Sequence, residues 1–451
     1  MNRCFLLALP LVFAAPLAAQ DQPFINELPG MGRPVDIAAT SARRQRLMDK
    51  VGDAVIVIHA NTERQGEPDG EYPQDNDFRQ HNTFFYFTML ETAGAYLIMN
   101  AHANAPDEVV LVLPPRVAAR ERWTGVRVGP DSVAARLSGI ATVVSTQQLD
   151  SVLNAARARN VPFYVTSDRT TRLQPQPVIN ALRADTARGL VVRSVRPMVD
   201  SMRHVKDAQE IAMVRRAAQI SAEAHVDLMR AARPGMFEYE MEAIIEAGFR
   251  RRGADRVGYP SIVGSGINAT TLHYDVNRRQ AQPGELVVVD AAAEIGQYTA
   301  DVTRTFPVSG RFTDRQRAIY NLVLGAQQAV IDSVRPGITF RRLGQIAAEY
   351  MRAHSGNLCG SEPCNRYYIH SMGHWIGMDV HDVSGPGGQD RPLEPGMTFA
   401  VEPGIYIPEE GFGVRIEDNI LVTPTGYELL TGAAPRTAED VERVMRRRES
   451  T

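Results

Sequence analysis

The chain of 451 residues lacks the features that mark several large classes of protein. It has no long run of lysine or arginine and a formal net charge of −3, which argues against nucleic-acid binding and against a polybasic membrane patch. It has no Gly-x-Ser-x-Gly segment, so the nucleophile elbow of serine hydrolases is missing. The remaining composition, 44% hydrophobic and 22% charged, is typical of a soluble globular protein long enough for two or three domains.

Cysteine is also scarce, with three residues in the whole chain. Cys4 lies in an apolar N-terminal segment, whereas Cys359 and Cys364 lie close together in LCGSEPCN. This pair can form a disulfide in an oxidising compartment or remain as two free thiols, and both possibilities stay open. No second Cys/His pair stands at finger-like spacing, which argues against a structural zinc site.

The apolar run at the N-terminus predicts a signal peptide. Arg3 gives it a positive start, residues 4–17 form an apolar core, and Ala18 and Ala19 precede a polar stretch. The run is too short to span a membrane. We therefore expect a signal peptide at residues 1–19 and an extended leader at 20–36. The protein is then exported, periplasmic or extracellular, with no stable membrane insertion after cleavage; an uncleaved anchor is the alternative.

The rest of the chain divides into two predicted units, and the fold class is α/β (α+β). Residues 37–197 alternate between strands and helices, which indicates an α/β domain. The predicted strands of this unit lie at 54–60, 84–90, 95–99, 109–113 and 161–166. Its predicted helices lie at 42–50, 132–137 and 148–159. In residues 198–451, helices at 204–232 and 237–252 precede one group of strands. A helix capped by Thr313 and Gln316 and another at 340–354 precede a second group.

An internal repeat relates these two groups. RPGMFEYEMEAIIEAGFRRRG resembles RPGITFRRLGQIAAEYMRAHSG, and QPGELVVVDAAAE resembles EPGMTFAVEPGIY. In the second pair of segments, Asp290 and Glu402 stand at the same offset after Pro-Gly. We expect each half to supply a second acid from its following strand, Asp301 or Glu417, so that a pseudo-twofold sheet brings all four acids together. Chance similarity between two helix–turn–strand units is the alternative.

Four carboxylates and one imidazole in this second unit stand near or within apolar, strand-like segments. They are Asp290, Asp301, His374, Glu402 and Glu417. Buried carboxylates are costly unless they are paired, hydrogen-bonded or bound to metal, so this set predicts a site for two divalent metal ions. Its oxygen-rich ligands suit Mn(II), Co(II) or Zn(II). Such a pair of ions activates water and polarises a carbonyl oxygen, which predicts hydrolysis of an amide or ester.

Three histidines and one arginine lie near these residues in the sequence. They are His273, His370, His381 and Arg415. A histidine can stabilise a developing oxyanion or hold a substrate carbonyl, although each one alone is more commonly structural. Arg415 precedes Glu417 by two residues and faces the same side of a strand. It can fix a ligand carboxylate there or be an ordinary surface residue.

Five segments together resemble those of the pita-bread metallopeptidases, and most closely those of aminopeptidase P. They are SIVGSGINATTLHY, VVVDAAAEIGQYTADVTRTFPVSGRF, HSMGHWIGMDVHDV, LEPGMTFAVEPGIYI and GVRIEDNILVT. In the first unit, FRQHNTFFYFTMLE resembles the N-terminal domain of the same family. The resemblance implies an aminopeptidase P N-terminal domain at 37–197 and a pita-bread catalytic domain with a pseudo-twofold repeat at 198–451.

The resemblance also implies roles for individual residues. Asp290 would bind one metal ion, Asp301 and Glu417 would bridge both, and His374 and Glu402 would complete the other, with Mn(II) the expected metal. Glu402 would also be the general base. The other implied site residues surround the substrate or support the ligands. They are His273, His370, His381, Arg415, Tyr406, Arg391 and Phe85; some family members have tryptophan in the segment of Phe85.

The implied activity is removal of the N-terminal residue from peptides with proline at the second position. The implied assembly is a homo-oligomer, a dimer or a tetramer. An Xaa-Pro dipeptidase is the first alternative, because Arg391 could bind the carboxylate of a dipeptide. The loop VSGPGGQDRPLEPGM is nevertheless shorter than in such dipeptidases, which favours the aminopeptidase. A non-catalytic pita-bread binding module is the second alternative, and the intact set of five ligands opposes it.

Overall fold

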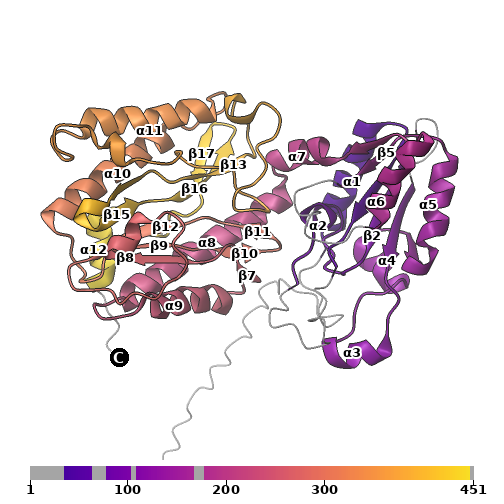
Figure 1. Cartoon of the computed structure of the whole chain (residues 1–451), viewed down its shortest axis with the longest axis horizontal. Helices are drawn as coiled ribbons and strands as arrows, with labels where there is room; N and C mark the ends of the chain where they lie inside the picture. Colours follow the sequence, from indigo (N-terminus) through magenta and orange to yellow (C-terminus); the bar gives the residue numbers. More distant parts are fainter. Residues whose placement is uncertain (1–34, 63–77, 103–107, 167–176, 447–451) are drawn as a thin grey trace, which may run out of the picture.

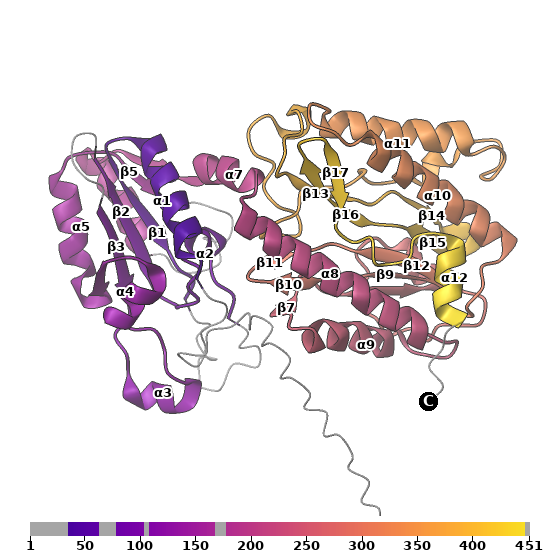
Figure 2. The same cartoon turned by 180° about the vertical axis from the view of Figure 1, so that it is seen from behind.

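The computed structural model describes residues 35–62, 78–102, 108–166 and 177–446. The predicted signal peptide at 1–19 and nearly all of the predicted leader at 20–36 lie outside the described residues. In the described part, helix α7 (Arg196–His204) runs between an N-terminal group of elements and a C-terminal group (Figures 1 and 2). The candidate ligands all belong to the C-terminal group.

The N-terminal group surrounds a sheet that has six strands within the described residues. Their order is β4-β3-β2-β1-β5-β6. Their bounds are β1 (Ala54–His59), β2 (Tyr96–Ala101), β3 (Glu108–Leu113), β4 (Thr142–Ser145), β5 (Phe163–Val165) and β6 (Val192–Ser194). The central strand β1 is buried along its whole length, as its run of branched apolar residues predicts. It pairs antiparallel with β2 and parallel with β5.

Helices pack on both faces of this sheet, because successive strand residues point to opposite sides. Ile56 belongs to the same core cluster as Leu47 of α1, whereas Val57 clusters with Leu153 of α5. Helix α1 begins earlier than predicted because the Asp36 side chain accepts a hydrogen bond from the Ala39 N–H at 2.9 Å. The helices are α1 (Ile37–Val51), α2 (Asn82–Thr88), α3 (Ala118–Thr124), α4 (Ser132–Ser138), α5 (Leu149–Ala158) and α6 (Pro177–Ala184).

Of the residues 84–90 predicted to be a strand, 84–88 instead lie in helix α2 and the last two follow it, so that prediction is wrong. A short buried run of aromatic residues fits a helix as well as a strand, and periodicity alone does not separate the two. Two arginines of α1 stabilise the C-terminal end of helix α2. Arg43 donates to the carbonyl of Tyr86 at 3.1 Å and Arg44 to that of Phe87 at 2.8 Å, which satisfies carbonyls left open by the last turn.

The helix predicted at 204–232 is divided between the end of α7 and α8 (Ala208–Ala231). Asp207 starts α8, because its side chain accepts hydrogen bonds from the N–H groups of Gln209 and Glu210 at 3.1 Å each. In return Glu210 accepts from the Asp207 N–H at 3.0 Å. This capping box fixes the break between the two helices.

Two helix pairs flank the strands of the C-terminal group (Figure 2). Helix α8 packs against α9, and α10 packs against α11. The predicted capping box of α10 is confirmed, with Gln316 N–H donating to the Thr313 hydroxyl at 3.2 Å and Thr313 N–H to the Gln316 side chain at 3.0 Å. The helices are α9 (Glu238–Arg251), α10 (Asp314–Ser333), α11 (Phe340–His354) and α12 (Ala438–Arg446). Across the described residues, no helix has the length and apolar character needed to cross a membrane.

The strands of this group form small antiparallel sheets, and two of them reproduce the predicted repeat. Strand β9 pairs with β12 in one half, and β13 pairs with β16 in the other. The strands are β7 (Arg256–Val257), β8 (Ile262–Ser265), β9 (Leu286–Asp290), β10 (Ala293–Ile295), β11 (Tyr298–Thr299), β12 (Thr303–Pro307), β13 (Thr398–Val401), β14 (Gly404–Ile407), β15 (Phe412–Arg415), β16 (Asp418–Thr423) and β17 (Gly426–Leu429).

Each half also contains a hairpin between its two paired strands, which the repeat did not predict. The hairpins are β10–β11 and β14–β15. Gly296 and Gln297 both have positive φ, 54° and 60°, as a tight two-residue hairpin turn requires. We expected the second acid of each half to lie in the following strand, but in both halves it lies just before a strand. Asp301 stands two residues before β12, and Glu417 stands directly before β16.

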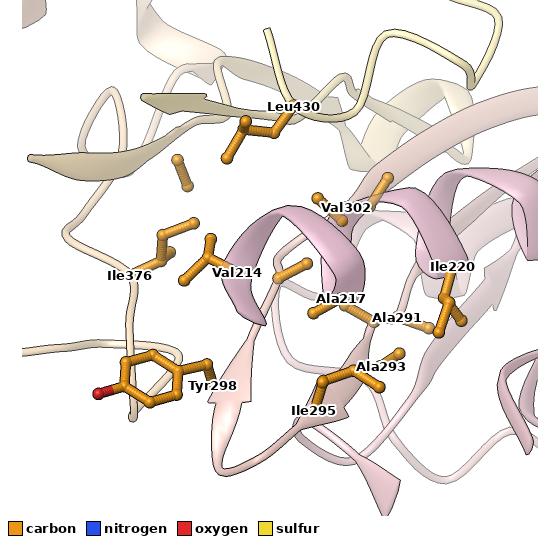
Figure 3. Packing of buried hydrophobic residues seen from close by; sticks show 14 of the residues in the cluster. Val214, Ala217, Ile220, Ala291, Ala293, Ile295, Tyr298, Val302, Ile376 and Leu430 are labelled. Carbon is orange, nitrogen blue, oxygen red and sulfur yellow. The ribbon is translucent and has the colours of Figure 1, made fainter. Parts of the chain in front are cut away.

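The core of the C-terminal group forms where α8 packs across these strands. Figure 3 shows Val214, Ala217 and Ile220 on one face of α8, turned toward apolar residues of the strand segments. These residues are fully buried, and small alanines on both sides let the helix approach closely. This packing supports the end of β9, which carries Asp290, and the residues before β12, which include Asp301.

Cys359 and Cys364, for which a disulfide and two free thiols were both possible, are joined by a disulfide. The bridge closes a short loop between α11 and a 3₁₀ turn at Cys364–Tyr367. Both sulfur-bearing residues are buried. The loop leads directly to the segment that carries His370 and His374.

Candidate metal centre

The five predicted ligands converge because the two halves of the repeat meet at their strand ends. Asp290 is the last residue of β9, and Glu402 follows the last residue of β13. In the paired strands, Asp290 lies opposite Thr303 and Val401 lies opposite Asp418. Asp301 and Glu417 therefore enter the same region from the neighbouring strands.

Hydrogen bonds join the two halves beside the ligands. The Asp301 N–H donates to the Asn419 side-chain oxygen at 2.9 Å, and the Asn419 amide donates back to the Asp301 carbonyl at 2.5 Å. The Glu417 N–H donates to the Thr303 carbonyl at 3.1 Å, and the Thr303 hydroxyl donates to the Glu417 carboxylate at 2.7 Å. The backbone around both bridging candidates is thus held before any ion binds.

His374 brings an imidazole to this group of acids. Its Nδ1 lies 3.2 Å from the Trp375 carbonyl, so Nδ1 carries the proton and Nε2 is free to bind metal. Nε2 lies 3.1 Å from Asp301 Oδ2, 3.6 Å from Glu402 Oε1 and 3.9 Å from Glu417 Oε1. These distances gather one nitrogen and three carboxylate oxygens around a common point.

Tyr259 also belongs to this centre, although no sequence pattern predicts it. Its hydroxyl lies 2.6 Å from Asp290 Oδ1 and 2.5 Å from Asp301 Oδ1, so it bridges acids of neighbouring strands. Burial, followed by the charges of these acids, raises the pKa of Tyr259 well above its usual value. The tyrosine therefore keeps its proton and can donate to only one of the two carboxylates at a time. In the sequence Tyr259 lies between Gly258 and Pro260, and this local pattern does not predict a contact with the two acids.

The carboxyl groups differ strongly in pKa. Burial, together with the neighbouring acids, raises the pKa of Asp301 and of Glu417 well above their usual values. Burial also raises the pKa of Glu402, to about 7. Burial opposes ionisation of Asp290 as well, but the charge and hydrogen bond of Arg415 and the bond from Tyr259 hold its pKa below the usual value. Four acids in one buried place thus repel one another.

The residues present fit divalent metal ions. Ligand atoms of Asp301, His374 and Glu417 all lie within 4.8 Å of one another. Glu417 Oε1 is buried and has no hydrogen-bond partner among the described residues, so a lone pair faces the cluster with nothing to satisfy it. A cation removes both the repulsion between the acids and this unsatisfied oxygen.

The ligands open onto a cavity of about 560 Å³. His273, His370 and His381 line it, as does Tyr406. The ring of His381 lies 4.0 Å from that of His374 and 6.5 Å from that of His273, centre to centre. Burial lowers the pKa of His370 and of His381 to about 4, so both are neutral near pH 7. The structure thus brings the three predicted histidines into one cavity beside the ligands.

Arg415 and Tyr406 connect one of these histidines to a ligand. Arg415 donates to Asp290 Oδ2 at 2.8 Å and to the Tyr406 hydroxyl at 2.9 Å. The Tyr406 hydroxyl lies 2.8 Å from His370 Nε2, and His370 Nδ1 lies 2.8 Å from the Ser371 carbonyl. Because the arginine and the carbonyl fix the two ends, the protons all point one way: Arg415 donates to Tyr406, Tyr406 to His370, and His370 to Ser371. Arg415 is buried and is not an ordinary surface residue.

Two predicted site residues are not brought to this cavity. Arg391 donates to Glu394 at 3.0 and 2.7 Å and lines a separate surface pocket with Ser201 and Asp390. Phe85 is buried within α2 in the core of the N-terminal group. Within one chain, neither side chain lines the cavity beside the ligands.

Two family models match the chain. Residues 212–424 match metallopeptidase family M24, and residues 40–164 match the aminopeptidase P N-terminal domain. The chain is 35% identical to an Xaa-Pro aminopeptidase of Escherichia coli, over 89% of this chain and 96% of the relative. It is 34% identical to an Xaa-Pro aminopeptidase of Haemophilus influenzae, with the same coverage of both chains.

Solved structures agree with these matches. A zinc-substituted aminopeptidase P of E. coli in complex with product superposes with a TM-score of 0.82 at 32% identity, covering 92% of this chain and all of that one. Aminopeptidase PepP of Pseudomonas aeruginosa gives the same TM-score at 33% identity, covering 92% of this chain and 99% of that one. The N-terminal domain followed by a pita-bread domain, implied by the resemblance, is confirmed. The chain is a metallopeptidase of family M24 and belongs to the aminopeptidase P family.

Proposed function

We propose that this enzyme is a dinuclear metal-dependent exopeptidase that releases the N-terminal residue from peptides with proline at the second position. The observation that carries the proposal is the meeting of four carboxylates and one imidazole beside three histidines in one cavity. The relatives named Xaa-Pro aminopeptidase support the substrate class. Family M24 implies divalent metal, and the proposal adds that two ions bind and that Mn(II) is the resident metal, with Co(II) or Zn(II) as substitutes.

Five residues would hold the ions. By the family resemblance, Asp290 would serve one ion, Asp301 and Glu417 would serve both, and His374 and Glu402 would serve the other. When bound, the ions supply an activated water and polarise the scissile carbonyl. Arg415 contacts Asp290 at 2.8 Å, and its positive charge keeps Asp290 ionised, as a metal ligand must be.

Glu402 is the proposed general base. Its carboxylate lines the cavity, with Oε1 3.6 Å from His374 Nε2, so it lies beside the water that the ions would activate. It takes a proton from the attacking water and delivers one to the proline nitrogen as the peptide bond breaks. His273 and His381 line the same cavity, from which they hold the substrate carbonyl and stabilise its developing negative charge.

The structure favours an aminopeptidase over a dipeptidase. A dipeptidase needs a cation that binds the carboxylate of its short substrate. Arg391, the residue of the short loop that could do so, pairs with Glu394 outside the metal cavity. This loop therefore places no positive charge in the metal cavity. A cavity without such a charge suits a peptide whose chain continues beyond proline, because no carboxylate follows the proline directly.

The proposal is tested with metal-loaded enzyme and matched peptides. Release of the first residue is measured from an Xaa-Pro-Yaa tripeptide, the corresponding Xaa-Ala-Yaa tripeptide and the Xaa-Pro dipeptide. We expect the first to be cleaved at least about 100-fold faster than the other two, in kcat/KM. Cleavage of the dipeptide alone supports the dipeptidase, and cleavage of none of them by protein with full metal content contradicts the proposal.

We also propose that the enzyme is exported and acts as a homo-oligomer. The N-terminal apolar run and the Cys359–Cys364 disulfide both suit an oxidising compartment. The dimer or tetramer rests on resemblance to the family. Fractionation of the producing cell and light scattering of the purified enzyme test these points; an intact N-terminus in the cytoplasm, or a monomer at assay concentration, contradicts them.

A further inference from the structure

We propose that Arg79 and Arg203 are positioning residues for His381, because they clamp the segment 377–382 between the N-terminal group and the α7–α8 connection. The inference rests on the proposed function, in which His381 contacts the substrate. It gives the N-terminal domain, which supplies none of the five candidate ligands, a part in the reaction.

The segment 377–382 has no regular secondary structure of its own. It forms part of the wall between two cavities, because His381 lines both the metal cavity and a second one of about 370 Å³. The second cavity lies where α7 meets the N-terminal group, and its lining includes Arg79, Arg203 and Asp382. Met378 is buried in the core and the Gly377 carbonyl accepts from the Thr299 N–H at 2.9 Å, so packing holds the start of the segment. His381 is exposed and borders open space on both sides, so its position depends on specific anchors.

The first anchor is a buried ion cluster next to His381. Arg203 of α7 lies 2.5 Å from Asp382 Oδ1, and Lys206 lies 3.3 Å from Asp382 Oδ2. The side chains of these three residues are 6%, 1% and 1% exposed, so solvent screens their attraction little. Although burial alone would raise the pKa of Asp382, the two cations hold it below its usual value. Arg203 also reaches Asp379 at 3.1 Å.

The second anchor comes from the N-terminal group. Arg79 donates to the backbone carbonyl of Met378 at 2.6 Å, and its Nε donates to Glu294 at 2.8 Å. Arg79 also donates to Asn82 at 2.8 Å, and Asn82 donates in turn to Asp379 at 2.8 Å. The N-terminal group therefore grips the backbone three residues before His381.

Arg79 holds the backbone at Met378, whereas Arg203 bonds both Asp379 and Asp382, and His381 lies between these two acids. A catalytic group displaced by about 1 Å can lose roughly 100-fold in rate, even when the cause is distant. Loss of Arg79 leaves Arg203 and Lys206 in place, so the segment is expected to loosen without unfolding the domain. Removal of Arg203 would instead leave Asp382 buried with one cation fewer, which risks the fold. Arg79 is therefore the residue to test.

The matched control is Arg256. It donates to the same Glu294 at 2.8 Å and to the carbonyl of Phe78 at 3.0 Å, so it too joins the C-terminal group to the N-terminal group. Those two bonds reach neither Met378 nor Asp379. Arg79→Gln and Arg256→Gln remove the same charge from the same carboxylate and differ in contact with the segment of His381.

The kinetic test is a double-mutant cycle on the metal-loaded enzyme with an Xaa-Pro-Yaa tripeptide. We expect Arg79→Gln to lower kcat/KM about 10-fold, but by less than about 2-fold in a His381→Ala background, because the loss acts through His381. Arg256→Gln is expected to stay within about 2-fold of wild type in both backgrounds, and metal content to be unchanged throughout. Equal losses from Arg79→Gln in both backgrounds would overturn the inference.

A second measurement does not depend on activity. Amide hydrogen exchange of the peptide covering 376–384 is expected to accelerate in Arg79→Gln and not in Arg256→Gln. Unchanged exchange in Arg79→Gln, or equal acceleration in both variants, overturns the clamp. A wild-type enzyme that does not cleave Xaa-Pro peptides refutes the proposed function instead, and the exchange result still decides whether Arg79 holds the segment.

Discussion

At the scale of single residues, the candidate ligands are held by different means. Asp290 is kept ionised by Arg415, whereas the pKa values of Asp301, Glu402 and Glu417 are raised by burial. One acid is thus ready to bind a cation, and three become good ligands only when a cation displaces their protons. In the metal-free protein Asp290 thus keeps its negative charge, whereas Glu402, with a pKa of about 7, is only partly ionised near neutrality.

Glu402→Gln is expected to lower kcat for Xaa-Pro-Yaa by about 1,000-fold or more, because the amide neither accepts the proton of water nor replaces a charged ligand. His354→Gln changes an exposed side chain at the end of α11 and serves as a control. Steady-state kinetics and metal content are measured together. Substantial turnover by Glu402→Gln with both ions bound would remove Glu402 from the role of base.

Metal is expected to stabilise the protein more at about pH 8 than at about pH 5.5. In the metal-free protein, Glu402 keeps a proton up to a pKa of about 7, whereas its unfolded value is 4.5. Between these values the folded state binds more protons than the unfolded state, so the free energy of unfolding falls as pH rises. The metal ions reverse this loss by taking the place of the protons.

The measurement is the Tm of stripped and Mn(II)-loaded protein at both pH values, with an expected metal-induced rise of about 5 °C or more at the higher pH. Comparing the two forms at each pH cancels groups that do not contact the ligands, such as His204. Burial lowers the pKa of His204 to about 4, so it acts in the opposite direction. An equal or larger rise at the lower pH contradicts this account of the carboxyl groups.

The sequence predicts some of these residues and not others, for physical reasons. Acids at the ends of apolar segments are costly enough to stand out, so Asp290 and Glu402 could be named before the fold was known. Tyr259 could not, because a tyrosine between glycine and proline has no pattern that requires two acids beside its hydroxyl. Arg79 was equally hidden, since its partners lie about 215 and 299 positions away in sequence.

At the scale of secondary structure, the repeat was predicted and its inserted hairpins were not. Similar Pro-Gly segments revealed β9 and β13, whereas the hairpin β10–β11 depends on a two-residue turn at Gly296 and Gln297 that a single glycine signals weakly. Helix α2 was mistaken for a strand because its aromatic residues are buried on every side. Local pattern fails where tertiary contacts, here those of Arg43 and Arg44, satisfy the backbone.

The disulfide gives a prediction at this scale. Its loop is short, with a sequence separation of 5, so the chain-entropy model expects it to contribute about 2 kcal/mol to the free energy of unfolding. Denaturant unfolding of the wild type with and without a thiol reductant measures this. A Cys359→Ala/Cys364→Ala variant is the control and should not respond to the reductant. A wild type whose unfolding is equally insensitive to the reductant contradicts the bond.

At the scale of the whole molecule, the metal centre, the cavity lined by His273, His370 and His381, and the domain boundary adjoin one another. The C-terminal group holds the acids, and the segment with His381 extends from them to the N-terminal group. Family membership accounts for both domains, and the contacts of Arg79 give a physical reason for keeping them together. Composition and motifs predicted the two units, but the contacts between them come from the fold alone.

The central claim is that four carboxylates and one histidine bind two metal ions on which peptide cleavage depends. The most direct measurement is a titration of metal-stripped enzyme with Mn(II), following both bound ions and cleavage of an Xaa-Pro-Yaa tripeptide. We expect the stripped enzyme to be inactive and binding to saturate at two ions per chain, with activity restored over the same range. Full activity without metal, or saturation of binding and activity at one ion, would contradict the account.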